Sequence, residues 1–352
     1  MVDVSEISIA GRPVGPAHPC LVIAEAGVNH NGDPELAHKL VDAAAEAGAD
    51  AVKFQTFKAE LVVTPDAPKA DYQLRYTGAG ESQLEMLRRL ELTPQMHHAL
   101  QIHCRERGLL FLSTPFDEGS ADFLETLSVE AYKIPSGEIT NLPLLAHVAR
   151  KRRPMIVSTG MSHLDEVETA VRVIRQEGNP QIVLLHCVSN YPALPGDINL
   201  RAMDTMAKAF GLPVGYSDHT QGIEVALGAV AMGACIIEKH FTLDRALPGP
   251  DHQASLEPDE LKALVRGIRV VQAALGNGRK EPTTSEANTA AVARRSLVAS
   301  RDLPAGTVLT EMDIAIRRPG AGLSPALRPY LVGRKTRVEL AAGSLLSLEM
   351  LV

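Results

Sequence analysis

Two histidines, His219 and His240, follow short apolar segments of the sequence and are candidates for metal ligands. Two imidazoles, together with carboxylates and water, can hold Mn²⁺, Fe²⁺, Co²⁺ or Zn²⁺. For either histidine alone, a structural role is the stronger interpretation. Because the two stand at matching depth on neighbouring segments, we favour a metal site for the pair.

Lysines and hydroxyl side chains stand at the ends of other apolar segments. Ammonium and hydroxyl groups are donors that suit a phosphate or a carboxylate. The candidates of this kind are Lys53, Thr114, Lys133, Ser136, Ser158 and Ser217. A Schiff-base lysine is the alternative for Lys133. Aldolases of the barrel fold that is predicted below also place a lysine at the end of a strand.

Three acids, Glu25, Glu138 and Asp251, are expected to converge on the site that the histidines, lysines and hydroxyl groups form. Carboxylates there can act as a base, activate water or bind a hydroxyl group. The remaining histidines, such as His97, His103 and His147, fall on segments predicted to be outer helices, and we interpret them as surface or packing residues.

Eight short apolar segments carry these polar residues, and segments with helical periodicity lie between them. The apolar segments begin at Cys20, Ala51, Leu109, Ala131, Pro154, Ile182, Pro213 and Cys235. A typical helical segment follows Asp33, a predicted N-cap, and starts at Pro34. Apolar strands alternating with amphipathic helices predict a parallel sheet. Residues 1–276 are therefore predicted to form an α/β fold, the TIM (β/α)8 barrel, with a doubly wound sheet as the competing fold.

The interval between Phe57 and Pro94 is too long for an ordinary loop between a strand and a helix. At the carboxyl end of a barrel strand such an insertion is expected to form a lid or a wall of the active site. A surface excursion without function is the alternative.

The C-terminal part of the chain changes character. Residues 277–295 show neither strand nor helix periodicity and are predicted to be a linker. Residues 296–352 contain short strands and turns rich in proline and glycine. A segment this short makes a marginal core, so we expect a small β-rich domain that packs against another protein surface.

Composition excludes several functions. Lys+Arg number 35 and Asp+Glu 42, which gives a net charge of −7. A chain with this net charge has no overall positive potential that would attract nucleic acid or anionic lipid. The four cysteines are scattered and are expected to be reduced. The longest apolar run, residues 226–237, is shorter than the roughly 20 residues of a membrane span. No signal peptide is predicted at the N-terminus, and the protein is expected to be soluble and cytoplasmic.

Motifs along almost the whole chain resemble those of the sialic (nonulosonic) acid synthases. They include AEAGVNHNG, AVKFQTF, APKADYQ, FLSTPFD, KIPSGEITNLPLL, LLHCVSNYP, GYSDHT, EKHFTLD and GPDHQASLEP. The C-terminal segment with IRRPGAGLSP resembles the SAF domain, which is related to type III antifreeze proteins. The resemblance implies condensation of phosphoenolpyruvate with an N-acetylated mannosamine and release of phosphate by C–O cleavage.

The resemblance also implies roles for individual residues. His219 and His240 match ligands of Mn²⁺, with Mg²⁺ or Co²⁺ as alternatives. The matches to phosphoenolpyruvate contacts are Lys53, Thr114, Lys133, Ser136, Ser158 and Ser217, and the matches around the sugar and the metal-bound water are Glu25, Gln55, Glu138, Tyr191 and Asp251. Ser189 replaces an asparagine that some relatives have at a phosphate contact. Arg318 matches an arginine that reaches the sugar's N-acetyl group in the partner's barrel, which implies a domain-swapped homodimer.

The expected function is that of an N-acetylneuraminate synthase. The alternative is a legionaminic acid synthase that uses 2,4-diacetamido-2,4,6-trideoxymannose. The antifreeze-like segment suggests a third, non-catalytic function in ice binding. The lysines, histidines and acids argue against it, because an ice-binding surface needs none of them.

Overall fold

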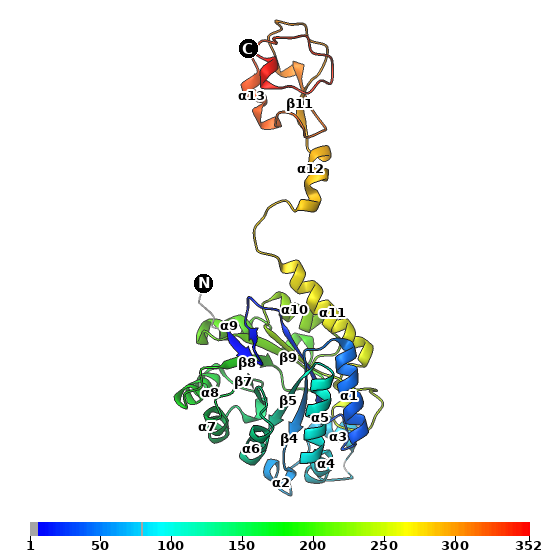
Figure 1. Ribbon diagram of the computed structural model, residues 1–352, viewed down its shortest axis with the longest axis vertical. Helices are drawn as coiled ribbons and strands as arrows, with labels where there is room; N and C mark the ends of the chain where they lie inside the picture. The colour runs from blue at the N-terminus through cyan, green and yellow to red at the C-terminus, as the bar shows by residue number, and fades with distance from the viewer. Residues whose placement is uncertain (1–5, 79) are drawn as a thin grey trace. The chain divides into compact units, whose positions relative to one another are not determined.

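The computed structural model describes residues 6–78 and 80–352, so the part of the N-terminal prediction that falls on residues 1–5 lies outside it. The chain divides into two compact units, residues 1–276 and residues 277–352. Figure 1 draws both units, the first in blue to yellow and the second in yellow to red.

The first unit is built on eight parallel strands. They are β3 (Leu21–Gly27), β4 (Ala51–Thr56), β5 (Leu110–Pro115), β6 (Tyr132–Ile134), β7 (Met155–Ser158), β8 (Ile182–Cys187), β9 (Val214–Asp218) and β10 (Ile236–His240). Their order in the sheet is β5-β4-β3-β10-β9-β8-β7-β6, and the end strands β5 and β6 lie side by side. The sheet therefore closes on itself, and the predicted TIM barrel is confirmed.

Helices surround this barrel, as Figure 1 shows. They are α1 (Pro34–Ala47), α5 (Pro94–Glu106), α6 (Glu118–Thr126), α7 (Leu142–Arg150), α8 (Leu164–Gln176), α9 (Ala202–Phe210), α10 (Glu224–Ala231) and α11 (Pro258–Leu275). In α1 the Asp33 side chain accepts hydrogen bonds from the backbone N–H groups of Glu35 and Leu36, and Gly48 ends the helix in the left-handed conformation. The N-cap and the helix start at Pro34 are thus as predicted.

The barrel interior changes from apolar to polar along each strand. Side chains alternate between the two faces of a strand, so Leu21, Ile23 and Glu25 of β3 point inward in turn, as do Ile236 and Glu238 of β10. A hairpin of β1 (Ile7–Ile9) and β2 (Arg12–Val14) packs on the apolar inward residues. The polar residues therefore collect at the carboxyl ends of the strands.

The insertion after β4 forms three short helices, α2 (Ala59–Val62), α3 (Asp71–Thr77) and α4 (Gln83–Leu90). A capping box starts α4, because Ser82 Oγ accepts from the backbone N–H of Glu85 and the Glu85 carboxylate accepts from that of Ser82. The described residues of the insertion thus form helices, placed after a strand that carries site residues.

The second unit is a small β-rich domain with its own core. It contains α12 (Ala287–Ala293), β11 (Ser296–Ala299), β12 (Ile314–Arg317) and α13 (Arg328–Leu331), and β11 pairs antiparallel with β12. The expectation that residues 277–295 lack helical structure was wrong for α12, whose alanine-rich sequence has high helix propensity. The Ala291 carbonyl accepts from Gly320 N, and a Cβ on Gly320 would lie 2.6 Å from Arg294 Cβ, so only glycine permits this contact.

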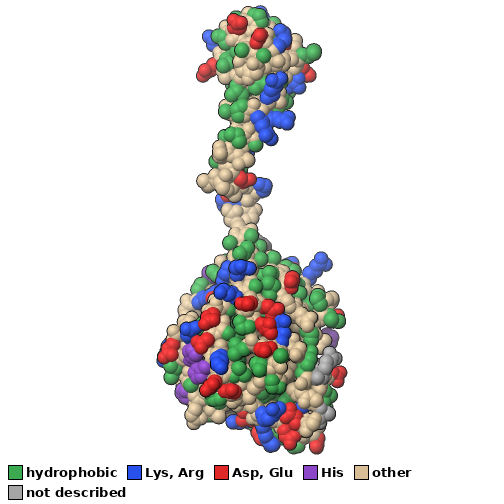
Figure 2. All heavy atoms as spheres, turned by 90° about the vertical axis from the view of Figure 1, so that its right-hand side faces the viewer, with side chains coloured by type: hydrophobic (Ala, Val, Ile, Leu, Met, Phe, Trp, Pro, Cys, Tyr) green, Lys and Arg blue, Asp and Glu red, His purple; other side chains and the backbone are tan. Residues whose placement is uncertain are grey.

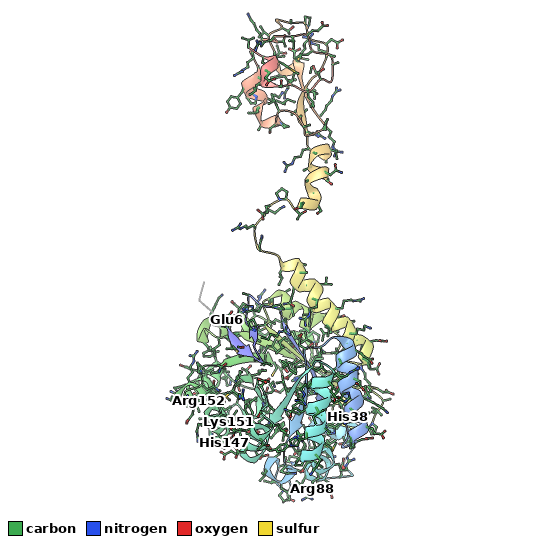
Figure 3. The ribbon with its side chains drawn as sticks, viewed as in Figure 1. Glu6, His38, Arg88, His147, Lys151 and Arg152 are labelled. Carbon is green, nitrogen blue, oxygen red and sulfur yellow. The ribbon has the colours of Figure 1, made fainter. Side chains whose placement is uncertain are left out.

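The surface of the first unit has no single sign of charge on the face drawn in Figure 2, where acidic and basic side chains are interspersed. His38 and His147 lie on the outer helices (Figure 3), and His147 bonds to Asp122. All four cysteines are buried and free, as expected. Within the described residues, no helix is long and apolar enough to cross a membrane.

Candidate active site

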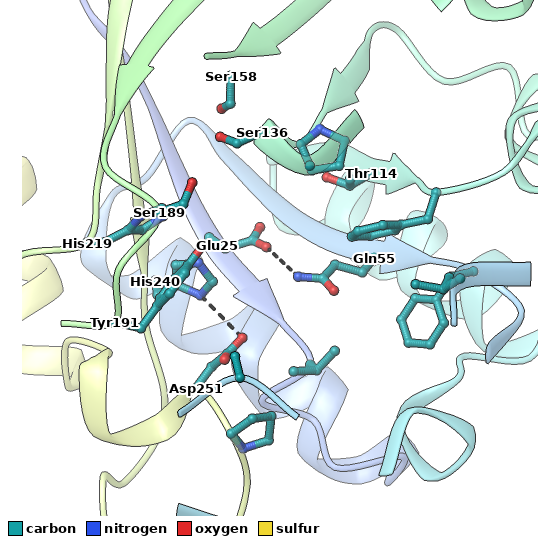
Figure 4. A pocket seen from close by; sticks show the side chains of 18 of the residues that line it. Glu25, Gln55, Thr114, Ser136, Ser158, Ser189, Tyr191, His219, His240 and Asp251 are labelled. Atoms are coloured by element: carbon teal, nitrogen blue, oxygen red, sulfur yellow. Dashed lines mark hydrogen bonds and ion pairs between the residues drawn. The ribbon is translucent and has the colours of Figure 1, made fainter. Parts of the chain in front are cut away.

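A cavity of about 400 Å³ opens at the carboxyl ends of the barrel strands. Its volume lies in the range of small-molecule sites. The predicted residues that line it are Glu25, Lys53, Gln55, Thr114, Lys133, Ser136, Ser158, Ser189, Tyr191, Ser217, His219, His240 and Asp251. Figure 4 shows Glu25 between the serine side chains and the His240–Asp251 pair. The structure thus brings together residues that are far apart in the sequence.

Two buried lysines and two buried acids form the base of the cavity. Lys53 Nζ lies 2.7 Å from Glu25 Oε2 and donates to Thr114 Oγ1 at 2.8 Å. Lys133 Nζ lies 3.2 Å from Glu238 Oε1, which also accepts a hydrogen bond from Ser217. The sheet register causes this arrangement, because it places Glu25 beside Lys53 and Glu238 beside Ser217.

The two acids differ in electrostatics. Burial raises the pKa of Glu25 to about 7, although Lys53 opposes the shift. Burial acts on Glu238 too, but Lys133 and Lys53 outweigh it and lower the pKa of Glu238 to about 2. Burial lowers the pKa of Lys133. Two neighbouring carboxyl groups whose pKa values are pushed apart are suited to different roles, with Glu238 the permanent counter-ion and Glu25 the group that can exchange a proton.

Serine hydroxyls surround a small space beside Lys133. A Cβ on Gly160, whose φ is +34°, would lie 2.3 Å from Ser136 Cβ and 2.5 Å from Ser189 Oγ. Only glycine keeps this space open. Ser158 Oγ is buried and has no hydrogen-bond partner within the described residues. An unpaired buried hydroxyl is costly unless a ligand satisfies it, so this part of the cavity suits an anion.

Two neutral imidazoles face the other side of the cavity. The ring centroids of His219 and His240 are 5.5 Å apart, and that of Tyr191 is 4.2 Å from that of His219. Burial lowers the pKa of His219 to about 4 and that of His240 well below its usual value. His219 Nδ1 donates to the Val188 carbonyl at 2.7 Å, which leaves Nε2 as the acceptor nitrogen.

These histidines fit a divalent metal ion. Neutral imidazoles whose tautomer is fixed by a second hydrogen bond are common metal ligands. His240 Nδ1 is buried without a hydrogen-bond partner in the described part of the chain, and it lies 4.0 Å from Asp251 Oδ2. Burial raises the pKa of Asp251 to about 6. Among the described residues no group of three or more His, Cys, Asp or Glu side chains forms a metal cluster.

The insertion supplies a second, apolar side of the cavity. A small hydrophobic cluster, separate from those of the barrel, contributes every one of its members to the cavity lining. We call it the apolar wall; it consists of Val28, Phe57, Val62, Met86, Leu87, Leu90 and Phe116. Gln73 of α3 and Gln83 of α4 also line the cavity. The insertion therefore forms a wall of the site, one of the two forms expected for it.

Two predicted residues are placed differently from the rest. Glu138 is half-buried in the 3-10 turn Ser136–Glu138 and accepts a hydrogen bond from Asn141 Nδ2 at 2.7 Å. Glu138 is not among the residues that line the cavity. A 3-10 helix has three residues per turn, so the side chain of Glu138, two residues after Ser136, points away from that of Ser136. Arg318 is exposed and belongs to the second unit.

One site residue was missed. Glu238 is buried among Lys53, Lys133 and Ser217, yet it was not among the site residues predicted from the sequence. The signal was present, since Glu238 and His240 are two residues apart on one strand and must share a face.

Comparisons with known proteins cover nearly the whole chain. Residues 40–280 match the model of the NeuB family, and residues 294–352 match that of the SAF domain. The chain is 50% identical to the N,N′-diacetyllegionaminic acid synthase of Legionella pneumophila over 95% of both chains. It is also 50% identical to the synthase of that name from Campylobacter jejuni, over 89% of this chain and 95% of the other. The structure of N-acetylneuraminic acid (sialic acid) synthetase from Leptospira borgpetersenii aligns with a TM-score of 0.72 and 37% identity, over 81% of this chain and 95% of the other.

Proposed function

The chain belongs to the NeuB family of sialic-type acid synthases, and we propose that it is an N,N′-diacetyllegionaminic acid synthase. The observation that carries the proposal is the 50% identity to two such synthases, against 37% to the sialic acid synthetase. The comparisons therefore favour the legionaminic alternative over the N-acetylneuraminate synthase that the motifs first suggested. The acceptor would be 2,4-diacetamido-2,4,6-trideoxymannose.

The base of the cavity supports binding of phosphoenolpyruvate. In this proposal Lys53 and Lys133 hold its phosphate and carboxylate groups, because charge-assisted hydrogen bonds to anions are the strong ones. Ser136, Ser158 and Ser189 donate around the space that Gly160 leaves open. The lysine ammonium groups offset the negative charge that the substrate brings into a buried site.

The acceptor sugar enters as its open-chain aldehyde beside the histidines. A divalent ion, Mn²⁺ by preference and Mg²⁺ or Co²⁺ as alternatives, would be held by His219 and His240 and would supply Lewis-acid polarisation of the aldehyde. Gln55, whose Nε2 donates to Glu25 Oε1 at 3.3 Å, and Tyr191 orient the sugar beside them.

The reaction forms one C–C bond and replaces the C2–O bond to phosphate with a C2–O bond from water. C3 of phosphoenolpyruvate attacks the aldehyde carbon, and the aldehyde oxygen takes up a proton, for which Asp251 is the nearby acid. Water then adds to C2 and gives its proton to Glu25, which lies beside Lys53. The tetrahedral carbon expels phosphate with the C2–O bond electrons and becomes a ketone, while its hydroxyl proton leaves with the phosphate.

We further propose that the site is completed by a second copy of the chain. In this arrangement the SAF domain of one chain covers the barrel of the other, and Arg318 donates to the acyl oxygen of the sugar. The exposure of Arg318 and the openness of the barrel's carboxyl end to substrate support the proposal.

Phosphate release by the full-length protein tests the proposed function. Phosphoenolpyruvate is offered with N-acetylmannosamine, with its 6-phosphate, or with 2,4-diacetamido-2,4,6-trideoxymannose, each in the presence of Mn²⁺. We expect the highest kcat/KM with the diacetamido sugar. A higher kcat/KM with N-acetylmannosamine would overturn the assignment in favour of the N-acetylneuraminate synthase.

A further inference from the structure

The apolar wall has no partner in the chemistry of the proposed reaction. Phosphate, carboxylate and aldehyde groups all need the polar base of the cavity. The wall is formed where the residues after β3, β4 and β5, such as Val28 and Phe57, meet Met86 and Leu90 of α4. All of these side chains are buried, yet they also line the cavity. A substrate that fills the cavity must therefore present an apolar group to them.

Two glutamines beside this wall offer a matched pair of polar groups. Gln73 Oε1 accepts from Ala70 N at 3.0 Å and from Gln83 Nε2 at 3.3 Å. Within the described residues no hydrogen bond is formed by Gln73 Nε2 or by Gln83 Oε1. Among the described residues, Gln73 Nε2 thus offers a donor group and Gln83 Oε1 an acceptor group, and such a pair complements an acetamido group with its C=O and N–H.

A buried lysine links the two short helices that carry these glutamines. Lys69 Nζ donates to Thr77 Oγ1 at 2.9 Å and to the Gly78 carbonyl at 3.2 Å, and it lies 3.5 Å from Glu81 Oε1. Thr77 Oγ1 in turn donates to the backbone carbonyl of Gln73. Lys69 therefore ties the end of α3, which carries Gln73, to the segment before α4, which carries Gln83.

We propose that the apolar wall and the Gln73–Gln83 pair form the subsite for the C6 methyl and the C4 acetamido group of the acceptor sugar, an inference that rests on the proposed function. N-Acetylmannosamine carries hydroxyl groups at both positions. A hydroxyl against the wall loses its hydrogen bonds to water and finds none in return. An apolar pocket rejects an analogue that adds a hydroxyl group by roughly 100-fold, so the subsite selects a 6-deoxy, 4-acetamido sugar over its hydroxylated analogue.

Two substitutions in the full-length chain test the subsite. Leu87→Gln places a polar group in the wall at a half-buried position of α4, and Gln83→Leu removes the amide. The measured quantity is kcat/KM for the diacetamido sugar divided by kcat/KM for N-acetylmannosamine. This ratio is insensitive to the fraction of folded enzyme. We expect Leu87→Gln to lower it about tenfold or more and Gln83→Leu about 3–10-fold, with an unchanged KM for phosphoenolpyruvate.

Leu61→Gln is the matched control, because Leu61 lies on α2, is 64% exposed and is outside the described cavity lining. It should leave the ratio unchanged. If the wild-type enzyme prefers the diacetamido sugar but the two variants shift the ratio no more than Leu61→Gln does, the subsite is refuted and the proposed function stands. If the wild-type enzyme prefers N-acetylmannosamine, the proposed function fails and this inference fails with it.

Discussion

Removal of one buried lysine should destabilise the barrel strongly. Lys239 is 1% exposed and lies on the outer face of β10, between Glu238 and His240. Its Nζ donates to Asp218 Oδ2 at 2.7 Å and to the Thr220 carbonyl at 2.5 Å. The pair joins the strands that carry the two histidines. Lys239→Met would leave the Asp218 carboxylate buried without its counter-ion.

The magnitude follows from this burial. Breaking a buried pair by removing one partner costs about 3–5 kcal/mol of unfolding free energy. At about 2.1 cal/mol/K per residue, unfolding of the 276-residue barrel has an entropy near 0.6 kcal/mol/K. The midpoint of thermal unfolding, followed by circular dichroism, should therefore fall by about 5–9 °C.

An exposed ion pair provides the control. Lys208 and Asp204 form an i,i+4 pair on α9 at 2.6 Å, with side chains 67% and 59% exposed. Lys208→Met should cost about 0.3–0.5 kcal/mol, or less than about 1 °C. The double variant Asp218→Asn/Lys239→Met should be more stable than Lys239→Met alone, since it buries no unpaired charge. A shift for Lys239→Met no larger than that for Lys208→Met would refute this reasoning.

Three further predictions concern the reaction. Removal of metal should abolish phosphate release, and Mn²⁺ should restore it. The variant His240→Ala should behave as the metal-free enzyme while keeping its circular dichroism spectrum. Full activity of an enzyme verified to be metal-free would contradict the metal site. Lys53→Met or Lys133→Met should weaken phosphoenolpyruvate binding by about 1.5–3 kcal/mol, or roughly 10–150-fold. Borohydride added during turnover should trap no covalent adduct on Lys133, whereas a trapped adduct would restore the Schiff-base alternative. Arg318→Ala should raise the KM of the sugar, and mixing Arg318→Ala chains with His240→Ala chains should recover activity; an inactive mixture despite proven heterodimers would exclude the swapped arrangement.

The barrel and most of its site could be predicted because both depend on local patterns. An apolar segment such as the one from Ala51 is expected to be buried on both faces, and a polar residue late in that segment, such as Gln55, must then lie near the strand's carboxyl end. The N-cap Asp33 fixes a helix start through contacts with its own neighbours. These signals span a few residues each, so they need no knowledge of the tertiary structure.

The remaining features depend on which segments meet in space. Glu238 is a site residue because Lys133, more than a hundred positions earlier, points at it. The apolar wall joins residues that follow three different strands to helices α2 and α4 of the insertion. Periodicity assigns each residue to a face of its own element, but it does not say which elements pack together. Glu138 shows the converse, since a local 3-10 turn rotated it away from a site that its sequence position suggested.

The two sides of the cavity are carried by different parts of the chain, and in the proposed function this separates the chemistry from the selection of the sugar. The lysines, Glu238 and the histidines stand on or directly after barrel strands, whose register fixes their distances. The α4 part of the apolar wall and both glutamines stand on the insertion, which Lys69 holds together through contacts of its own. A substitution in α4 therefore changes the surface offered to the sugar without moving the ion pairs at the base of the cavity.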